Sequence, residues 1–158
     1  MLSILITLAA LVGPPWISIE YPANPLDRTT RNAYLLVHSF HHETAVQQHI
    51  TGEAMTWENG RKRTVTLRFE STSRAGVYRL DKQWTDGTPW VLRITVGSHG
   101  PESIGATALV SVDRLGAVAK VLVPSEPYRD FRVPRAPTEG EITGAFQAAG
   151  GTELAAVR

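Results

Sequence analysis

Three histidines lie close together in the chain, at His38, His41 and His42, and Glu43 follows them directly. Imidazole and carboxylate groups are ligands for copper, zinc and iron in proteins. His38 and His42 could approach each other across the end of a strand. The spacing matches no established ligand pattern, so three interpretations stay open. The cluster is a copper or zinc site, a pH-responsive contact, or a group of polar loop residues beside one strand histidine.

No other motif in the chain points to catalysis. The sequence has no Gly-x-Ser-x-Gly elbow, no P-loop, no His-Glu-x-x-His and no dinucleotide-binding fingerprint. Its acidic residues are scattered singly, so no carboxylate pair stands out for acid–base work. We therefore expect a protein that is not an enzyme and carries no cofactor, with copper or zinc as the alternative. The net charge of +1 does not favour nucleic acid as a partner.

Length and composition predict one globular domain. The chain has 158 residues, of which 42% are hydrophobic and 20% are charged. A chain of this length can bury a core without covalent cross-links. The absence of cysteine excludes a disulfide framework and thiolate metal sites.

The first fifteen residues form a hydrophobic N-terminal segment. Residues 1–12 carry no charged side chain, and as a helix they would be about 18 Å long, too short for a hydrocarbon core of about 30 Å. The segment is a cleaved secretory signal, a retained anchor in one leaflet, or a strand of a soluble domain. As an anchor it would bind the membrane surface through Leu2, Ile4, Leu5, Ile6 and Leu8, with Trp16 at the interface. The first two interpretations predict a periplasmic or extracytoplasmic, membrane-associated protein.

Residues 16–123 carry about eight short runs of strand-like pattern, at 16–21, 33–40, 49–57, 63–70, 76–84, 90–96, 106–112 and 117–123. Such regular spacing predicts an all-β fold, an immunoglobulin-like antiparallel β-sandwich. Asn59-Gly60 predicts a type I′ hairpin turn. The runs 76–84 and 90–96 alternate in polarity around a loop with Gly and Pro, which predicts a second hairpin at the centre of the fold.

The run Arg74-Ala75-Gly76-Val77-Tyr78-Arg79-Leu80 resembles the tyrosine corner of immunoglobulin-like domains, in which a tyrosine opens the penultimate strand. Residues 33–96 resemble small extracytoplasmic immunoglobulin-like domains of the YtkA/FixH type. Leu80 stands where the second cysteine of an immunoglobulin domain would be, and the motifs concern the fold alone. The resemblance implies an accessory role in metal or redox membrane systems and assigns no catalytic residue.

Residues 124–158 form a Pro-rich arm followed by a short helix. Four prolines between positions 124 and 137 favour an extended polyproline II arm with one basic and one aromatic edge. Thr138 to Glu141 is a capping box that starts an amphipathic helix. The arm and helix pack on their own sandwich, dock on a partner, or stay disordered. For docking, the expected partner-binding residues are Tyr128, Arg129, Phe131, Arg132, Arg135, Ile142 and Phe146.

These features together predict a non-catalytic, extracytoplasmic structural or accessory subunit that docks on a membrane protein complex. In layout the chain resembles the membrane-extrinsic subunits of bacterial respiratory or photosynthetic reaction-centre complexes. One alternative is a periplasmic metal-handling accessory protein that uses the histidine cluster. Another is a secreted module that binds sugar or peptide through exposed Trp57 or Trp84.

Overall fold

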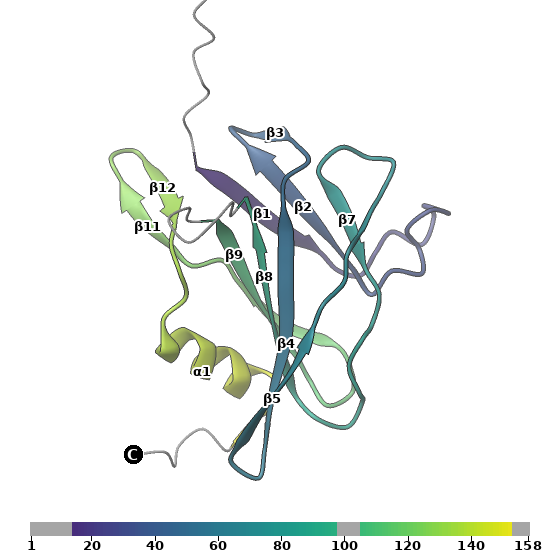
Figure 1. The fold of residues 1–158 in the computed structure, drawn as a ribbon, viewed down its shortest axis with the longest axis vertical. Helices are drawn as coiled ribbons and strands as arrows, with labels where there is room; N and C mark the ends of the chain where they lie inside the picture. The colour runs from purple at the N-terminus through teal and green to yellow at the C-terminus, as the bar shows by residue number, and fades with distance from the viewer. Residues whose placement is uncertain (1–13, 98–104, 153–158) are drawn as a thin grey trace, which may run out of the picture.

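The fold is a β-sandwich with one helix on its outer side (Figure 1). The computed structural model describes residues 14–97 and 105–152. The anchor residues expected at Leu2, Ile4, Leu5, Ile6 and Leu8 lie outside the described residues. All strand pairs described are antiparallel, so the all-β class and the antiparallel pairing are confirmed.

Within the described residues, each of the two sheets of the sandwich has five strands. The first has the order β1 (Pro15–Glu20), β2 (Leu35–His41), β7 (Val77–Leu80) and β6 (Glu70–Ser71), and β3 (Thr44–Ala45) also pairs with β2. The second has the order β10 (Val118–Leu122), β9 (Ala106–Val112), β8 (Trp90–Val96), β4 (Ile50–Glu58) and β5 (Arg61–Thr66). A separate pair, β11 (Ser125–Tyr128) and β12 (Phe131–Pro134), precedes helix α1 (Glu139–Ala148). β1 is an edge strand and β2 is internal.

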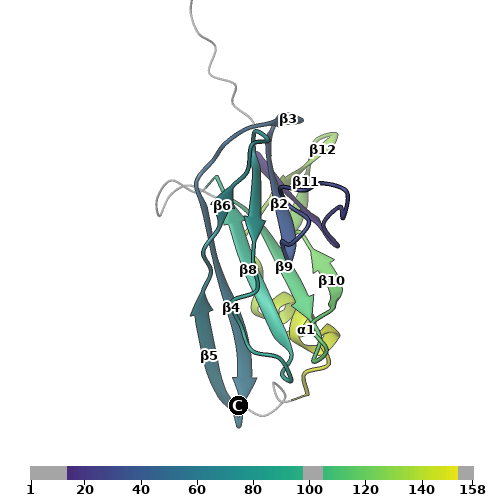
Figure 2. The ribbon, with the colours of Figure 1, turned by 90° about the vertical axis from the view of Figure 1, so that its right-hand side faces the viewer.

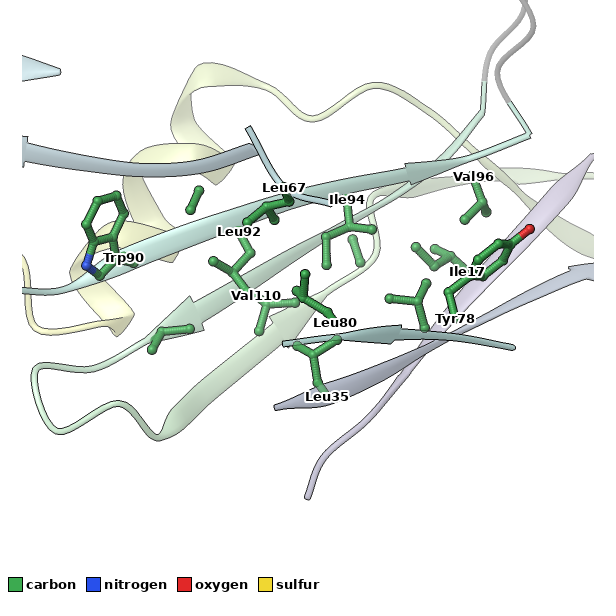
Figure 3. Close-up of a cluster of buried hydrophobic side chains, with 14 of the residues drawn as sticks. Ile17, Leu35, Leu67, Tyr78, Leu80, Trp90, Leu92, Ile94, Val96 and Val110 are labelled. Atoms are coloured by element: carbon green, nitrogen blue, oxygen red, sulfur yellow. The ribbon is translucent and has the colours of Figure 1, made fainter. Parts of the chain in front are cut away.

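The core lies between the two sheets. Side chains of β2 and β7, such as Leu35 and Leu80, face Leu92 and Val110 of the opposite sheet, and all four are fully buried (Figure 3). Alternate residues of a strand point to opposite faces. Val91 therefore lies on the outer face of its sheet, where it is buried among side chains of helix α1. The inner and outer faces of the second sheet are thus both covered.

The Asn59–Gly60 turn is confirmed. β4 and β5 pair from Glu58↔Arg61 onwards, which leaves these two residues as the loop. Both have the positive φ that a type I′ turn requires, 51° at Asn59 and 72° at Gly60.

The prediction that residues 76–84 and 90–96 form a hairpin is wrong. β7 pairs with β2 and β6, whereas β8 pairs with β4 and β9, so the two strands belong to opposite sheets. Tyr78 and Trp90 nevertheless both face the shared core, as their alternation predicted. A polar/apolar alternation tells which face of a strand is buried but not which sheet the strand joins. The nine residues 81–89 cross from one sheet to the other.

The polyproline II conformation expected for residues 124–137 is also wrong, because this arm folds into the β11–β12 hairpin. Pro127 pairs with Arg132 and Ser125 pairs with Pro134 in a ladder of only two strands. A two-stranded ladder leaves one edge of each strand unpaired, where proline is tolerated without its N–H. The hairpin lies at the upper end of the sandwich and α1 lies beside its lower half (Figures 1 and 2).

Helix α1 packs on the outer face of the second sheet. Its capping box is confirmed: the Thr138 side chain accepts a hydrogen bond from the Glu141 N–H, and the Glu141 carboxylate accepts one from the Thr138 N–H. Ile142 and Phe146 are 8% and 1% exposed and contact Met55, among other side chains of the sheet. Ile142 and Phe146, which were expected to bind a partner, cover the protein's own sheet in this structure.

Phe146 anchors the helix to the sheet, so we expect Phe146→Ala to lower the free energy of unfolding by about 3–5 kcal/mol. Denaturant unfolding followed by circular dichroism measures this loss. Gln147→Ala on the exposed side of the same helix is the matched control and should change the free energy by less than about 0.5 kcal/mol. Equal effects of the two substitutions would contradict the packing described.

The capping box also predicts a pH dependence. Hydrogen bonds from Arg135, and then from the Thr138 backbone, lower the pKa of the Glu141 carboxyl from 4.5 to about 2. A lowered pKa in the folded state stabilises the protein above pH 4.5, and the gain is lost as the pH falls from 4.5 towards 2. Glu141→Gln should therefore lower the urea midpoint at pH 7 and have no effect near pH 2. Glu139→Gln, on the exposed side of the first turn, is the control, and a gap for Glu141→Gln that persists at pH 2 would refute this role.

Candidate functional site

An apolar groove of about 540 Å³ lies at the end of the sandwich where β1 begins. We call it the end groove, and its lining residues are Pro14, Trp16, Phe40, His42, Glu43, Phe131 and Arg132. They come from the start of β1, from the end of β2 with its turn into β3, and from β12 (Figure 1). Three aromatic rings line the groove and three polar side chains stand with them. Such a surface can bind an apolar group and hydrogen-bond at the same place.

The register of β1 and β2 explains why the groove forms. Trp16 pairs directly with Phe40, and Pro15 pairs with His41, so residues 24 and 26 positions apart become neighbours. Residues directly opposite each other on neighbouring strands have their side chains on the same face. The end of β8 closes in on the same place, since a Cβ on Gly97 would meet Pro15 Cβ at 2.7 Å. A glycine is needed there because its φ is +78° and no side chain fits.

The turn between β2 and β3 is made by two residues that rarely adopt its backbone geometry. His42 has a φ of 48° and Glu43 has a φ of 64°, in a position where Asn-Gly is preferred. A residue other than glycine with positive φ costs about 1–3 kcal/mol, and such residues concentrate at binding sites. Arg129, in the turn of the β11–β12 hairpin, also has a positive φ of 56°. Of the four such residues in the described part of the chain, only Asn59 lies away from this end.

The turn of the β11–β12 hairpin exposes an aromatic pair beside the end groove. We call residues 128–131 the hairpin tip. Tyr128 and Phe131 are opposite each other, with ring centroids 5.4 Å apart, and they are 50% and 47% exposed. The guanidinium of Arg129 lies 5.4 Å from the centroid of the Tyr128 ring. These predicted partner-binding residues therefore remain on the surface.

The three arginines of the arm do not share the basic edge that a polyproline II helix would give them. Arg132 donates hydrogen bonds to the side chain and backbone oxygens of Ser125 at 2.8 and 2.7 Å. Arg135 donates two hydrogen bonds to the Glu141 carboxylate at 2.8 and 2.7 Å. Arg135 thus joins the hairpin to the helix.

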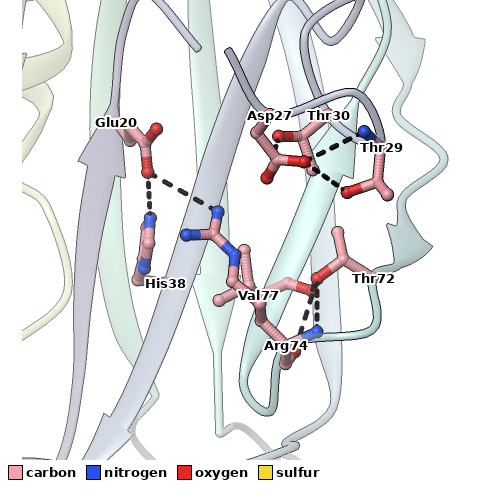
Figure 4. Close-up of polar contacts among 8 residues, drawn as sticks. All are labelled: Glu20, Asp27, Thr29, Thr30, His38, Thr72, Arg74 and Val77. Atoms are coloured by element: carbon pink, nitrogen blue, oxygen red, sulfur yellow. Dashed lines mark hydrogen bonds and ion pairs between the residues drawn. The ribbon is translucent and has the colours of Figure 1, made fainter. Parts of the chain in front are cut away.

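The histidines do not converge on one point. His38 Nε2 lies 2.8 Å from Glu20 Oε2, and the same oxygen lies 3.8 Å from Arg74 (Figure 4). His41 and His42 lie together, with ring centroids 4.8 Å apart. Among residues 14–97 and 105–152, no three His, Asp or Glu side chains are grouped so that they could hold a metal ion. The geometry therefore does not assemble the metal site expected at His38, His41 and His42.

Polar contacts order the long loop between β1 and β2, which lies next to the His38–Glu20 pair. The Asp27 carboxylate accepts hydrogen bonds from the Thr29 and Thr30 hydroxyls, both at 2.7 Å, and from the Thr29 N–H at 2.9 Å (Figure 4). These bonds, the Thr29 hydroxyl first, lower the pKa of Asp27 to about 2. The contacts are local to the loop, so they indicate a structural role.

The two tryptophans expected to bind sugar or peptide are not exposed. Trp84 is 7% exposed and belongs to the core. Trp57 is half-buried, and its ring lies 4.7 Å from that of Phe146 under helix α1. The expectation of an exposed tryptophan platform at these two positions is therefore wrong, because both rings cover apolar surface of the protein itself.

Comparisons with models of protein families, with curated proteins and with solved structures found no significant match for this chain. No helix within the described ranges is long and apolar enough to cross a membrane.

Sequence reasoning missed Phe40 as a groove residue and missed the pairing that places it beside Trp16. No local signal could have identified Phe40, because its role depends on a strand 24 residues away. The hairpin tip did carry a signal. Tyr128 and Phe131 flank the dipeptide Arg129-Asp130, a spacing that suits a two-residue hairpin loop.

The strained turn yields a test. Replacing His42 and Glu43 together by Asn and Gly should raise the free energy of unfolding by about 1 kcal/mol or more, because both residues then suit the turn. The reciprocal change, Asn59→His with Gly60→Glu, should lower it by a similar amount. Thermal and denaturant unfolding measure both. A loss of stability on changing His42 and Glu43 would show that these side chains stabilise the turn rather than strain it.

Proposed function

We propose that the protein is a non-catalytic structural or accessory subunit that docks on a membrane protein complex outside the cytoplasm. In this proposal the end groove and the hairpin tip are the side turned towards the membrane. One observation carries the proposal: the start of β1 and the C-terminal hairpin meet at the same end of the sandwich. Pro14, within the expected hydrophobic segment 1–15, lines this groove.

The exposed rings of the hairpin tip support the same orientation. Large apolar side chains on a soluble surface mark contact sites when they gather with others, whereas single ones do not. Tyr128 and Phe131 contact each other and continue into the groove through Phe131. The resemblance in layout to membrane-extrinsic subunits makes respiratory and photosynthetic reaction-centre complexes the candidate hosts.

We also propose that the sandwich is immunoglobulin-like. In immunoglobulin domains, strands A, B, E and D form one sheet, and C, F and G form the other. The order β1-β2-β7-β6 corresponds to A-B-E-D, and β4, β8 and β9 correspond to C, F and G. This mapping puts Tyr78 on the fifth of the seven strands. Its hydroxyl contacts the Gln48 backbone, 30 residues upstream. The likeness to YtkA/FixH-type domains is therefore proposed from strand order and not from the tyrosine corner.

The metal-handling alternative has less support. It requires the imidazoles of His38, His41 and His42 to meet, whereas His38 is paired with Glu20. A peptide- or sugar-binding module would have to use Trp16 in the end groove in place of Trp57 or Trp84.

Membrane retention tests the proposed function. The full chain should stay with native membranes through a high-salt wash and co-purify with a defined set of membrane proteins after solubilisation in mild detergent. Tyr128→Ser with Phe131→Ser should lower the retained fraction about tenfold, since two rings lose their contact. Leu26→Ser with Leu115→Ser is the control, because these side chains are 88% and 91% exposed and neither lines the end groove. Recovery of the wild-type chain as a free monomer in the soluble extracytoplasmic fraction would refute the proposal.

A further inference from the structure

We propose that the end groove and the hairpin tip contact the lipid bilayer itself, at the level of the headgroups, through aromatic side chains rather than through charge. This inference rests on the proposed function, which brings the chain to a membrane. It adds that the folded domain binds lipid at a defined place, beside whatever protein contacts hold it. The occupant of the groove is thus the interfacial layer of a bilayer.

The first argument is the type of side chain gathered there. Trp16, Phe40, Tyr128 and Phe131 come from three separate segments of the chain and lie in or beside one groove. Aromatic side chains, and Trp and Tyr above all, favour the membrane–water interface, where an apolar ring and a polar edge are both satisfied. These three segments are far apart in the sequence. The register of β1 and β2 and the position of the β11–β12 hairpin bring their side chains together.

The second argument is the place where the chain enters the described fold. Residues 1–13 contain no charged side chain, and Pro14 already lines the groove. A helix of about 18 Å does not cross a hydrocarbon core of about 30 Å. A short apolar segment that enters the bilayer therefore leaves the residues after it in the chain at the membrane–water interface. Trp16 stands two residues after Pro14, with its side chain in the groove. The groove is therefore lined by the residues that directly follow, in the sequence, the segment expected to enter the membrane.

The third argument is the balance of charge. Arg132 and Glu43 line the groove, and Glu126, Arg129 and Asp130 belong to the β11–β12 hairpin beside it. The Arg132 guanidinium is already bound to Ser125, and that of Arg129 lies near the Tyr128 ring. Opposite charges close together leave little net attraction for anionic headgroups. Binding should therefore depend weakly on lipid charge and on salt.

The fourth argument is that the tip is held in place. The Arg135 N–H donates to the Pro124 carbonyl oxygen at 3.1 Å, closing the base of the hairpin. The Arg135 side chain bonds to Glu141 at the start of helix α1, which packs on the sheet. A binding surface that is already ordered loses less conformational entropy on contact. The rings are thus presented to one side of the molecule by the fold itself.

Protein-free vesicles test the inference. The full-length chain is mixed with vesicles of phosphatidylcholine, with and without phosphatidylglycerol, and the bound fraction is measured by flotation at low and high salt. We expect binding to both vesicles with similar partition coefficients. Tyr128→Ser with Phe131→Ser should lower both coefficients about ten- to thirty-fold, because each ring is half-exposed and its burial in the interface is lost.

Two controls are matched to this variant. Leu26→Ser with Leu115→Ser removes two exposed apolar side chains that do not line the end groove and should leave both partition coefficients unchanged. Arg129→Gln should lower binding less than twofold on either vesicle. Circular dichroism of each variant shows whether it keeps the fold. Equal losses for the tip variant and the leucine control would overturn the inference. Binding that requires phosphatidylglycerol and disappears at high salt would also overturn it.

A second readout locates the contact. Phosphatidylcholine brominated along its acyl chains quenches tryptophans that lie close to the hydrocarbon region. Trp84 and Trp90 are buried and Trp57 lies under helix α1, so the quenching should come from Trp16 and vanish in Trp16→Phe. Quenching that persists in Trp16→Phe would refute the placement of the groove. If wild-type chain binds no vesicle but still co-purifies with a membrane complex, the inference fails and the proposed function stands. If it binds vesicles but no complex, the proposed function fails.

Discussion

The burial of two sheet faces against each other is the interaction on which the rest of the structure depends. Leu35 and Leu80 on one sheet and Leu92 and Val110 on the other are fully buried in one cluster. The chain has no cysteine, so no cross-link helps to hold the sheets. Because burial of apolar surface is the main driving force of folding, the register of every strand is set by which of its faces must enter this core.

This constraint decides where the start of β1 and the β11–β12 hairpin lie. The register that buries Ile17 in the core also pairs Trp16 with Phe40 at the end of the sandwich. The second sheet has an apolar outer face as well, and α1 covers it with Phe146 at the centre of the contact. Once the helix is fixed there, the bond between Arg135 and Glu141 fixes the hairpin that precedes it. The end groove therefore follows from two separate contacts: the packing of the two sheets against each other and the packing of helix α1 on the outer face of the second sheet.

Features that depend on neighbouring residues were predictable from the sequence. The Asn59–Gly60 turn and the capping box at Thr138 follow from the φ preferences and hydrogen-bonding groups of adjacent residues. The burial of alternate residues in β8 follows from the period of a strand.

Features that depend on distant residues were not predictable in this way. Alternation placed Tyr78 on a buried face, but only the global topology puts β7 and β8 in opposite sheets. Four prolines suggested a polyproline II arm, yet a two-stranded ladder tolerates proline equally well. Their spacing in the sequence suggested that His38 and His42 could meet. In the structure, His38 pairs with Glu20, which comes from another strand.

The orientation of the domain on the membrane is the central claim, and the lack of native cysteine gives a direct measurement of it. Single cysteines at Asp130→Cys in the hairpin tip and at Leu115→Cys in the opposite turn can each be modified with a bulky maleimide that does not cross membranes. Modification rates are compared between purified protein in detergent-free buffer and protein in native membranes. The account predicts a strong slowing on membranes at position 130 and none at position 115. Equal rates at position 130 in both preparations, or slowing at position 115 alone, would contradict it.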